Sequence, residues 1–483
     1  MNAKKSSLRG HLRMNIPKLQ SLKLSLIDIY SPKTDEGKGR LISLTSAMVA
    51  ALYNVFITGI FYTGFLSMYG ISITGVGIIT FIPYIATCFS LFSPSILGRF
   101  RKRKWILLAA KIYFYAMYII ATTLMPQFVT DPDDRLTWFI ILLFLAYSVY
   151  ALFSPGFTTW FYRFYPAESE RRTRYIALNQ TFASILSSIM LLVSGLLTDA
   201  VEGSAMQDTL ILGFRYFAFV LVIVDVLMQA AAKEYPYAEA PKLRLDKVFT
   251  IPFRYRKFLL CMIVMFVWNY IGNLNNGLWN YHLLNHLHFS YTVINIVTML
   301  YTLILLCTGA FWQKLLHRYS WIKTFGIASL LFTPTEFLMF TLTPGMEWLW
   351  AVTSCVQHFC SVGLNFAYAN ILYLNLPEEE STACISFNTI GCNVFAFLGM
   401  ITGTWVSSFG NDSAMPFLFG MNVYAVQYTT LLRAVGLSTI GILLIVGWRK
   451  LTPDHEITVI EQTQEHLEKR RKNLLNRWKR RGT

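Results

Sequence analysis

The segment KEYPYAEAPKLRLDKVFTIPFRYRK, residues 233–257, is the longest polar stretch that separates apolar runs in this chain. It carries Pro236, Pro241 and Pro252, which disfavour a continuous helix and are typical of a linker. On both sides of it the chain shows runs of roughly 20 mostly apolar residues, the length of a helix that crosses a membrane. The segment therefore divides the chain into two parts of about six expected spans each.

The composition indicates that these runs lie in lipid. Of the 483 residues, 54% are hydrophobic and only 14% are charged, which is more apolar surface than a soluble core of this size can bury. We therefore predict an all-α polytopic membrane protein with about 12 transmembrane helices in two pseudo-symmetric six-helix bundles. The expected spans are 42–69, 72–97, 105–125, 137–163, 176–200, 209–232, 258–284, 291–313, 322–342, 347–374, 382–409 and 424–447.

The distribution of basic residues sets the expected orientation. With the N-terminus inside, nearly all of the 42 Lys and Arg residues fall in the two tails and the inner loops, and only Arg135 falls in an outer loop. This bias follows the positive-inside rule, so we expect both termini in the cytoplasm. The net charge of +16 then indicates contact with anionic membrane lipids rather than with nucleic acid. We expect a multi-pass protein of the bacterial inner (plasma) membrane.

The same pattern predicts five segments along the chain. They are a cytoplasmic N-terminal tail (1–41), a first six-helix bundle (42–232), a cytoplasmic linker (233–257), a second six-helix bundle (258–449) and a basic cytoplasmic tail (450–483). The N-terminal tail is polar and basic, so it does not resemble a cleavable signal peptide with its apolar core. The run from Glu461 to Arg481 mixes leucines with Lys and Arg, which is typical of either an interfacial helix or a solvated basic tail.

Short matches between the two parts support an internal repeat. After the second expected span the chain reads LGRF (97–100), and Lys104 closes the loop. After the eighth it reads LHRY (316–319), and Lys323 follows at the same distance. Each match is weak alone, but the two fall in equivalent inner loops, as expected if the two bundles are related repeats.

The first of these loops carries a family resemblance. The major facilitator superfamily has a signature of the form G-x-x-x-D-R-x-G-R-[RK] between its second and third helices, and this chain reads PSILGRFRKR over 94–103. Arg99, Lys102 and Arg103 match the signature, whereas Gly98 stands where the family has Asp. The chain thus resembles a major facilitator superfamily transporter. The resemblance implies a gating loop that includes Arg99, Lys102 and Arg103, with Arg318 in the equivalent loop of the second part.

The resemblance also implies that helices 1, 4, 7 and 10 line a central cavity, and polar residues gather on these helices. Helix 7 carries four amides, at Asn269, Asn273, Asn276 and Asn280. Their spacing would place all four within a sector of about 60° on a continuous helix. A stripe of amides does not favour contact with lipid. The candidate substrate-binding residues are Asn54, Thr58, Tyr147, Tyr150, Ser154, Asn269, Asn273, Asn276, Asn280, His358, Ser361 and Asn365. The alternative is that these stripes hold helices together, as Ser, Thr and Asn commonly do in membranes.

Ionisable residues within the spans fall instead on helices that the resemblance makes peripheral. Lys111, Arg215 and Arg433 can be explained by long side chains that reach a membrane boundary or by positions close to one. Asp225 and Glu336 are candidates for coupling, because a buried carboxylate can carry a proton, and structural pairing is the alternative use. His358 is the third coupling candidate, since imidazole gains and loses protons near neutral pH.

Other reactive residues point to no cofactor. His282, His286 and His288 lie close together in the sequence but have no carboxylate or cysteine nearby, so we expect no metal site. The seven cysteines lie in or beside spans and contain no CxxC pair, which is typical of buried apolar fillers.

These observations favour a secondary transporter that works by alternating access, and not an enzyme. Because the expected cavity is neutral and rich in amides, the substrate should be a small neutral hydrogen-bonding solute, with sugars or polyols favoured. Proton or sodium coupling and simple facilitation both remain open, and we expect a monomer. The alternatives are a multidrug or amphipathic-compound exporter of the same fold, a membrane-embedded transferase, which would need a convergent catalytic cluster, and a channel.

Overall fold

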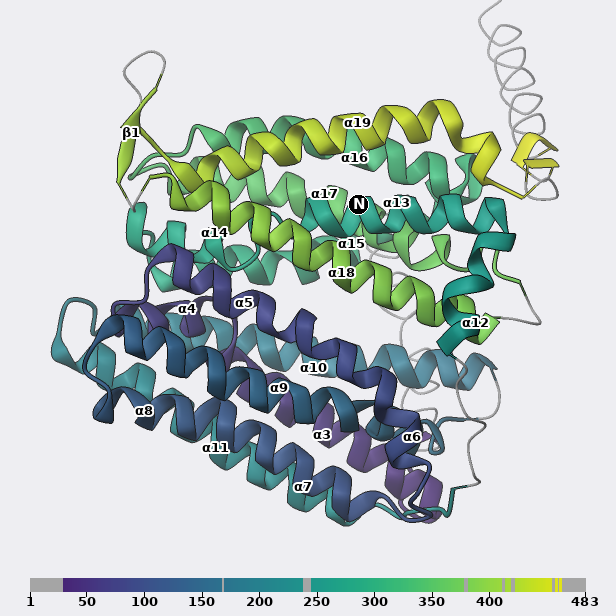
Figure 1. The fold of residues 1–483 in the computed structure, drawn as a ribbon, viewed down its shortest axis with the longest axis horizontal. Helices are drawn as coiled ribbons and strands as arrows, with labels where there is room; N and C mark the ends of the chain where they lie inside the picture. Colours follow the sequence, from purple (N-terminus) through teal and green to yellow (C-terminus); the bar gives the residue numbers. More distant parts are fainter. Residues whose placement is uncertain are drawn as a thin grey trace, which may run out of the picture.

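The computed structural model describes residues 29–166, 169–237, 245–377, 381–410, 413–417, 422–453, 457–458 and 460–462. Within these ranges the chain forms long helices that run side by side, together with one small hairpin at one end of the bundle (Figure 1). Most of the predicted N-terminal tail and of the basic run near the C-terminus lies outside the described residues.

The first part of the chain supplies one group of helices. Thr34 is the N-cap of the first helix. Its hydroxyl accepts a hydrogen bond from the N–H of Gly37 at 3.0 Å, which pairs a donor that has no partner within the helix. The helices are α3 (Asp35–Ile57), α4 (Gly59–Met68), α5 (Ile73–Thr87), η2 (Cys88–Phe92), α6 (Ser93–Leu97), α7 (Lys104–Tyr115), the π-helix η3 (Ala116–Ala121), α8 (Thr122–Phe128), α9 (Pro132–Tyr162), α10 (Ser169–Asp199) and α11 (Ala205–Ala230).

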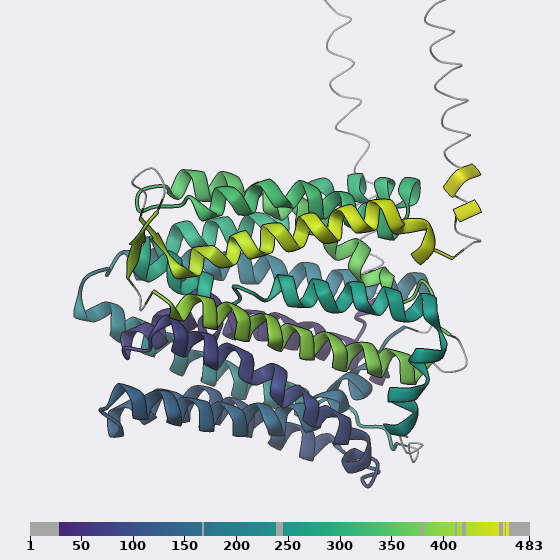
Figure 2. The ribbon, with the colours of Figure 1, turned by 45° about the horizontal axis from the view of Figure 1, so that its top comes forward.

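The second part supplies a matching group. Its elements are α13 (Arg256–Gly272), α14 (Leu278–Tyr281), the π-helix η5 (His282–His286), α15 (Tyr291–Tyr319), α16 (Trp321–Phe340), α17 (Glu347–Ile371), α18 (Ser381–Ser408), β1 (Ala414–Pro416), β2 (Asn422–Tyr424), η7 (Ala425–Gln427) and α19 (Tyr428–Leu451). The two strands pair antiparallel, with Ala414 opposite Tyr424. Figures 1 and 2 place this group, from teal to yellow, beside the purple and blue helices of the first part.

The expected linker is partly helical. Within 233–257 the structure has α12 (Leu245–Thr250) and the short 3₁₀ turn η4 (Pro252–Arg254). No continuous helix crosses the described residues of this segment, because α12 ends at Thr250 and Pro252 occupies the first position of a separate turn, where its missing N–H removes no hydrogen bond. Residues 238–244 of this segment lie outside the described ranges.

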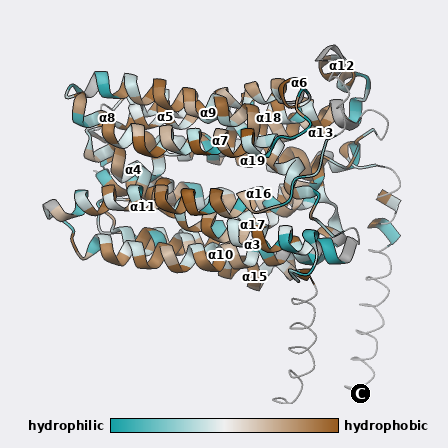
Figure 3. Cartoon of the chain, turned by 90° about the horizontal axis from the view of Figure 1, so that it is seen from below, coloured by the Kyte–Doolittle hydropathy of each residue, from teal (hydrophilic) through white to brown (hydrophobic). Residues whose placement is uncertain are grey.

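Length and hydropathy agree with a membrane location. Nine helical segments in the described part of the chain are long and apolar enough to span a membrane. The other three expected spans correspond to α13, α16 and α17, so the full count of about 12 stays a prediction. Hydrophobic residues predominate along the helices, and hydrophilic residues gather near the end that holds α12 (Figure 3).

Two large hydrophobic cores, besides two small clusters, hold the described part of the bundle together. The larger one is built around aromatic residues of the first part such as Phe65 and Trp160, and it also includes Tyr291 and Trp350 of the second part. The other is built around Trp312 and other residues of the second part. Because lipid is as apolar as these side chains, close packing rather than escape from water stabilises such contacts.

Candidate functional site

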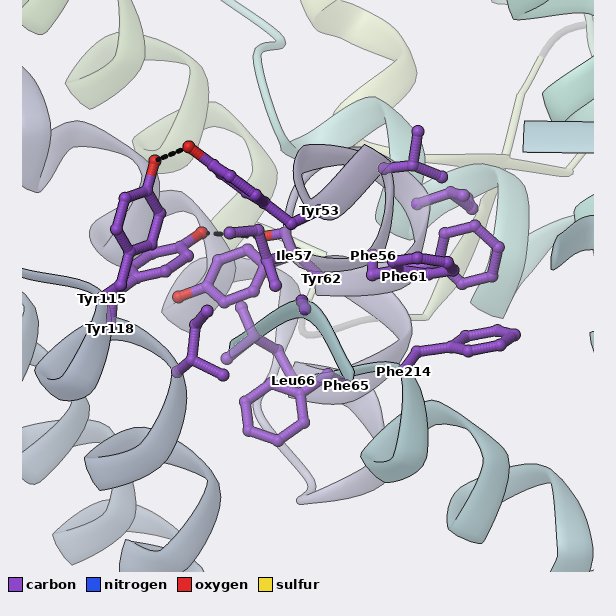
Figure 4. Packing of buried hydrophobic residues seen from close by; sticks show 14 of the residues in the cluster. Tyr53, Phe56, Ile57, Phe61, Tyr62, Phe65, Leu66, Tyr115, Tyr118 and Phe214 are labelled. Atoms are coloured by element: carbon purple, nitrogen blue, oxygen red, sulfur yellow. Dashed lines mark hydrogen bonds between the residues drawn. The ribbon is translucent and has the colours of Figure 1, made fainter. Parts of the chain in front are cut away.

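The first expected span is interrupted in its middle. α3 ends at Ile57 and α4 begins at Gly59, which has a φ of +59° that favours glycine. The break frees backbone carbonyl groups, and the Tyr118 hydroxyl donates to the Ile57 oxygen at 2.8 Å (Figure 4). Interrupted helices are tolerated at membrane depth where they line a cavity or are buried in protein.

The seventh expected span is interrupted in the same way. α13 ends at Gly272, the segment NLNNG (273–277) forms turns, and Gly277 adopts a φ of +76° before α14 begins. A Cβ at Gly277 would lie 2.5 Å from the Thr80 methyl group, so the two parts of the chain approach closely here. The expectation of four amides on one continuous helical face is wrong, because Asn and Gly favour helix ends and the helix stops among them.

Three adjoining cavities surround these breaks. The central cavity has a volume of about 420 Å³ and is lined by Thr58, Gly59, Tyr62, Ile79, Thr80, Pro83, Tyr84, Thr87, Tyr118, Leu143, Tyr147, Asn276 and Asn393. The α10–α15 cavity, of about 300 Å³, shares Thr58 and Gly59 with it. The α3–α9 cavity, of about 430 Å³, shares Asn54 with the α10–α15 cavity. The three are therefore neighbouring parts of one polar region.

Half of the predicted binding residues line this region. Thr58, Tyr147 and Asn276 line the central cavity. Asn54 and Asn280 line the α10–α15 cavity, and Asn54 also lines the α3–α9 cavity with Tyr150. The linings combine hydroxyl and amide groups with aromatic and aliphatic surface, which suits a small molecule that forms several hydrogen bonds.

The other predicted binding residues line none of these three cavities; they are Ser154, Asn269, Asn273, His358, Ser361 and Asn365. Asn273 lies just behind the central cavity, because its side-chain oxygen accepts a hydrogen bond from the Tyr84 hydroxyl at 3.1 Å. His358 and Asn365 bond to α15 instead, through the Val297 carbonyl at 2.9 Å and the Tyr301 hydroxyl at 3.0 Å. These two contacts match the alternative in which polar residues join neighbouring helices.

Sequence reasoning missed residues on helices that were expected to be peripheral or were not considered. Tyr118 on η3 and Tyr84 on α5 both line the central cavity. Lys111 on α7 lines the α3–α9 cavity. The expectation that the third span is peripheral to the cavity is therefore wrong. The available signal was the presence of a lysine within an apolar span.

The ionisable residues within the spans form pairs. The Lys111 ammonium lies 2.6 Å from the Asp225 carboxylate, and Arg433 lies 3.1 Å from Glu336. Both carboxylates are almost completely buried. The expectation that Lys111 and Arg433 reach a membrane boundary is wrong, because each points to a buried carboxylate whose charge it balances.

Arg215 is also fully buried, so it does not reach a boundary either. Its guanidinium donates to the Tyr118 carbonyl at 2.9 Å and to the hydroxyls of Thr122 and Thr123 at 2.8 Å. It also lies 3.8 Å from the centre of the Phe65 ring. A π-helix leaves carbonyl groups without their usual partners, and Arg215 supplies donors to those of η3.

The predicted gating loop contacts the start of the linker. The Glu234 carboxylate accepts hydrogen bonds from the backbone N–H groups of Arg103 and Lys104. The Arg103 guanidinium also lies 4.1 Å from the centre of the Tyr237 ring. Arg99 and Lys102 are exposed in the same loop, and Arg318 is exposed at the end of α15. The loop and the linker thus form one connected surface in the first part of the chain.

The histidines of η5 join each other and the hairpin. The Nδ1 atoms of His282 and His286 lie 2.9 Å apart, and Tyr424 of β2 stacks on the His286 ring with centres 3.9 Å apart. Within the described ranges no group of three or more His, Cys, Asp or Glu residues is placed to hold a metal ion.

Comparison with known proteins relates this arrangement to a family. Residues 258–481 match the family model described as Major Facilitator Superfamily. No curated protein matches the chain in sequence. The fold resembles that of the nucleoside transporter NupG, with a TM-score of 0.59 and 15% identity over 86% of this chain and 98% of that one.

Two further solved structures show the same fold. A bacterial homologue of the human lysosomal transporter Spinster, inward-facing and occupied, has a TM-score of 0.60 and 12% identity over 87% of this chain and 97% of that one. A D-xylose–proton symporter has a TM-score of 0.56 and 10% identity over 87% of this chain and 99% of that one. Residues 258–481 thus match the Major Facilitator Superfamily model, and the chain shares its fold with these transporters.

Proposed function

We propose that the protein carries a small uncharged solute with several hydrogen-bonding groups, with sugars or polyols ahead of other classes. The observation that supports this most is the polar region at the two helix breaks, which is lined by hydroxyl and amide groups of both parts of the chain. Discontinuous helices in corresponding positions of two repeats commonly form the substrate site of secondary transporters. Two of the structural relatives are a nucleoside transporter and a D-xylose–proton symporter, whose solutes are uncharged and carry hydroxyls.

The contacts between the two parts support an alternating-access cycle. The Asp199 carboxylate, at the end of α10, accepts hydrogen bonds from the backbone N–H groups of Tyr291 and Thr292 at 2.9 and 2.8 Å. Nearby, Tyr291 stacks on Phe61 with ring centres 5.5 Å apart. These contacts lie at the end that we propose faces outside, whereas Tyr162, which lines the α3–α9 cavity near the other end, is 56% exposed. We infer from these contacts that the site is closed to the outside in this state.

We place the protein in the bacterial inner membrane with both termini in the cytoplasm, acting as a monomer. The bias of Lys and Arg toward the tails and inner loops supports this orientation. Cysteine introduced at Glu202, in the turn between α10 and α11, should react with an impermeant thiol reagent in intact cells from which the native cysteines have been removed. Cysteine at Lys233 should react only after permeabilisation, and the reverse result would overturn the orientation.

Among the three coupling candidates we place proton coupling at Asp225. It is the one that adjoins a cavity of the site, through its partner Lys111, whereas His358 and Glu336 line none of the three cavities. The titratable groups that bond to Asp225 are the Lys111 ammonium and the Tyr53 hydroxyl, the Gln229 amide also donates to it, and Tyr115 and Tyr150 line the same cavity as Lys111 and Tyr53.

Transport into proteoliposomes tests the proposal. The purified full chain should show saturable counterflow of at least one member of a panel made of D-xylose, D-glucose, sorbitol and uridine. Asn276→Leu should lower uptake roughly 5- to 150-fold, because a solute hydrogen bond worth about 1–3 kcal/mol is lost in the central cavity. Asn370→Leu is the matched control, since Asn370 bonds to a carbonyl of its own helix and lines none of the three cavities. Equal loss in both variants would point to helix packing instead.

A second candidate function is export of an amphipathic compound, and one cavity favours it. A cavity of about 180 Å³ between η2 and α18 shares Thr87 and Asn393 with the central cavity. Cys88 lines it and is exposed, so this cavity lies at the bundle surface. Protection of Cys88 from a lipid-soluble maleimide by a cationic dye, without protection by any sugar, would favour the exporter.

A further inference from the structure

The α3–α9 cavity has one charged side chain in its wall. Its lining residues include Tyr53, Asn54, Lys111, Tyr115 and Tyr150. Among the described residues Lys111 is the only Lys, Arg, Asp or Glu that lines any of the three cavities of the site. Its side chain is 10% exposed, so part of this side chain reaches the cavity that it lines.

The partner of Lys111 is fixed on the side away from the cavity. The Asp225 side chain is fully buried and accepts hydrogen bonds from Lys111 at 2.6 Å, from Tyr53 at 3.3 Å and from Gln229 at 3.2 Å. Gln229 is held in turn by Ser46 at 2.6 Å. Three donors from three different helices therefore hold the Asp225 carboxylate in place. These hydrogen bonds satisfy the carboxylate without a contribution from a solute.

The Lys111 ammonium, by contrast, has more N–H groups than acceptors within the described structure. A lysine side chain carries three N–H groups, and Asp225 is the only hydrogen-bond acceptor that the described structure gives to Lys111. Its other neighbour is the Phe157 ring, 5.7 Å from the nitrogen, and that ring also lines the cavity. Two N–H groups thus remain for an acceptor that enters the cavity.

We propose that Lys111 is a solute-binding residue that donates to a hydroxyl or carbonyl oxygen of the transported molecule. Asp225 balances the charge of Lys111, so the site binds an uncharged solute and rejects its carboxylate counterpart. This inference rests on the proposed function and adds a specificity-determining residue on a helix that the family resemblance makes peripheral. It accounts for a lysine in a site whose other polar groups are neutral.

The second part of the chain holds a pair that serves as an internal control. Arg433 and Glu336 line none of the three cavities, and the Arg433 guanidinium is used within the bundle, where it donates to the Asn275 oxygen at 2.7 Å. Removing the charges of Arg433 and Glu336 therefore measures the general effect of losing a buried ion pair, while the lining of the three cavities stays unchanged.

Solute binding by matched variants of the full chain tests the proposal. Binding of D-xylose, D-glucose, sorbitol and uridine to the purified protein is measured by thermal shift and by saturable counterflow in proteoliposomes. Lys111→Gln with Asp225→Asn removes both charges and keeps polar groups, and it should weaken binding of the solute that the wild type accepts at least tenfold. Arg433→Gln with Glu336→Gln should leave that affinity within twofold. Equal losses in both double variants, or a loss below twofold in the first, would overturn the proposal.

A second variant keeps the test decisive if the double variant folds poorly. Asp225→Asn leaves the Lys111 ammonium without a balancing charge, so the cavity becomes cationic. This variant should gain at least tenfold in affinity for D-glucuronate and D-gluconate relative to the wild type, and no such gain would contradict the proposal. Absence of saturable transport of every solute by the wild type would instead overturn the proposed function, and the inference with it.

Discussion

Within the described residues each part of the chain buries one ion pair, and the two pairs are built differently. In the first part the Asp225 carboxylate accepts hydrogen bonds from Lys111, Tyr53 and Gln229. In the second part Glu336 lies 3.1 Å from Arg433, yet neither of its carboxylate oxygens has a hydrogen bond of acceptable geometry within the described residues. The first carboxylate is held by a network and the second by a single charge.

The cations of the two pairs also have different surroundings. Lys111 faces a cavity of about 430 Å³, whereas Arg433 donates to Asn275 within the break between α13 and α14. A buried ion pair can thus contribute either to solute binding or to the stability of the helix bundle. The contacts of its cation, with a cavity or with another helix, distinguish the two roles. We therefore expect loss of the first pair to affect transport and loss of the second to affect stability.

The largest expected effect is on stability, from Arg433→Met. This change leaves the buried Glu336 carboxylate without the one cation that the described structure gives it, and Asn275 without the Arg433 donor, which should cost about 3–5 kcal/mol. Thermal unfolding of the purified protein measures it. Arg433→Met with Glu336→Met should recover most of the loss, because an apolar pair removes the uncompensated charge. A single variant as stable as the wild type would show that Glu336 needs no partner.

The two helix breaks should differ less in how much a glycine substitution lowers the free energy of unfolding. Gly277→Ala should destabilise the protein by about 1–3 kcal/mol, because the left-handed backbone is strained for alanine and the new Cβ meets Thr80 at 2.5 Å. Gly59→Ala should cost about 1–2 kcal/mol, since a Cβ there meets no atom within 4 Å and only the backbone strain remains. Thermal unfolding of both variants checks the order, and a larger loss at Gly59 would contradict it.

The smallest expected effect on transport of uncharged solutes is a change in its pH dependence. If Asp225 is the coupling group, Asp225→Asn should flatten the pH dependence of solute accumulation and spare downhill exchange, because an amide cannot bind and release the proton. Glu336→Gln and His358→Gln should retain the wild-type profile. Uptake by proteoliposomes under an imposed pH gradient measures all three. A flat profile in His358→Gln alone would return the coupling role to His358.

Several features of the site could be read from the sequence, and others could not. Thr58, Tyr147 and Asn276 were expected to line a cavity and do so, because polar groups within apolar spans avoid lipid. His358 and Asn365 satisfy the same requirement by bonding to α15 instead. A stripe of polar residues shows that they avoid lipid, and not whether the groups they face belong to a cavity or to another helix.

The sequence by itself determined the class of the protein, its helix positions and its expected orientation, because the length of apolar runs and the placement of Lys and Arg are set by the membrane and need no knowledge of neighbours. Only the tertiary structure decided that Lys111 faces Asp225 and a cavity, and that α13 stops at Gly272. The partners in these features are far apart in the chain, and packing alone brings them together. Local pattern therefore cannot assign a buried charge its partner or a polar residue its neighbour.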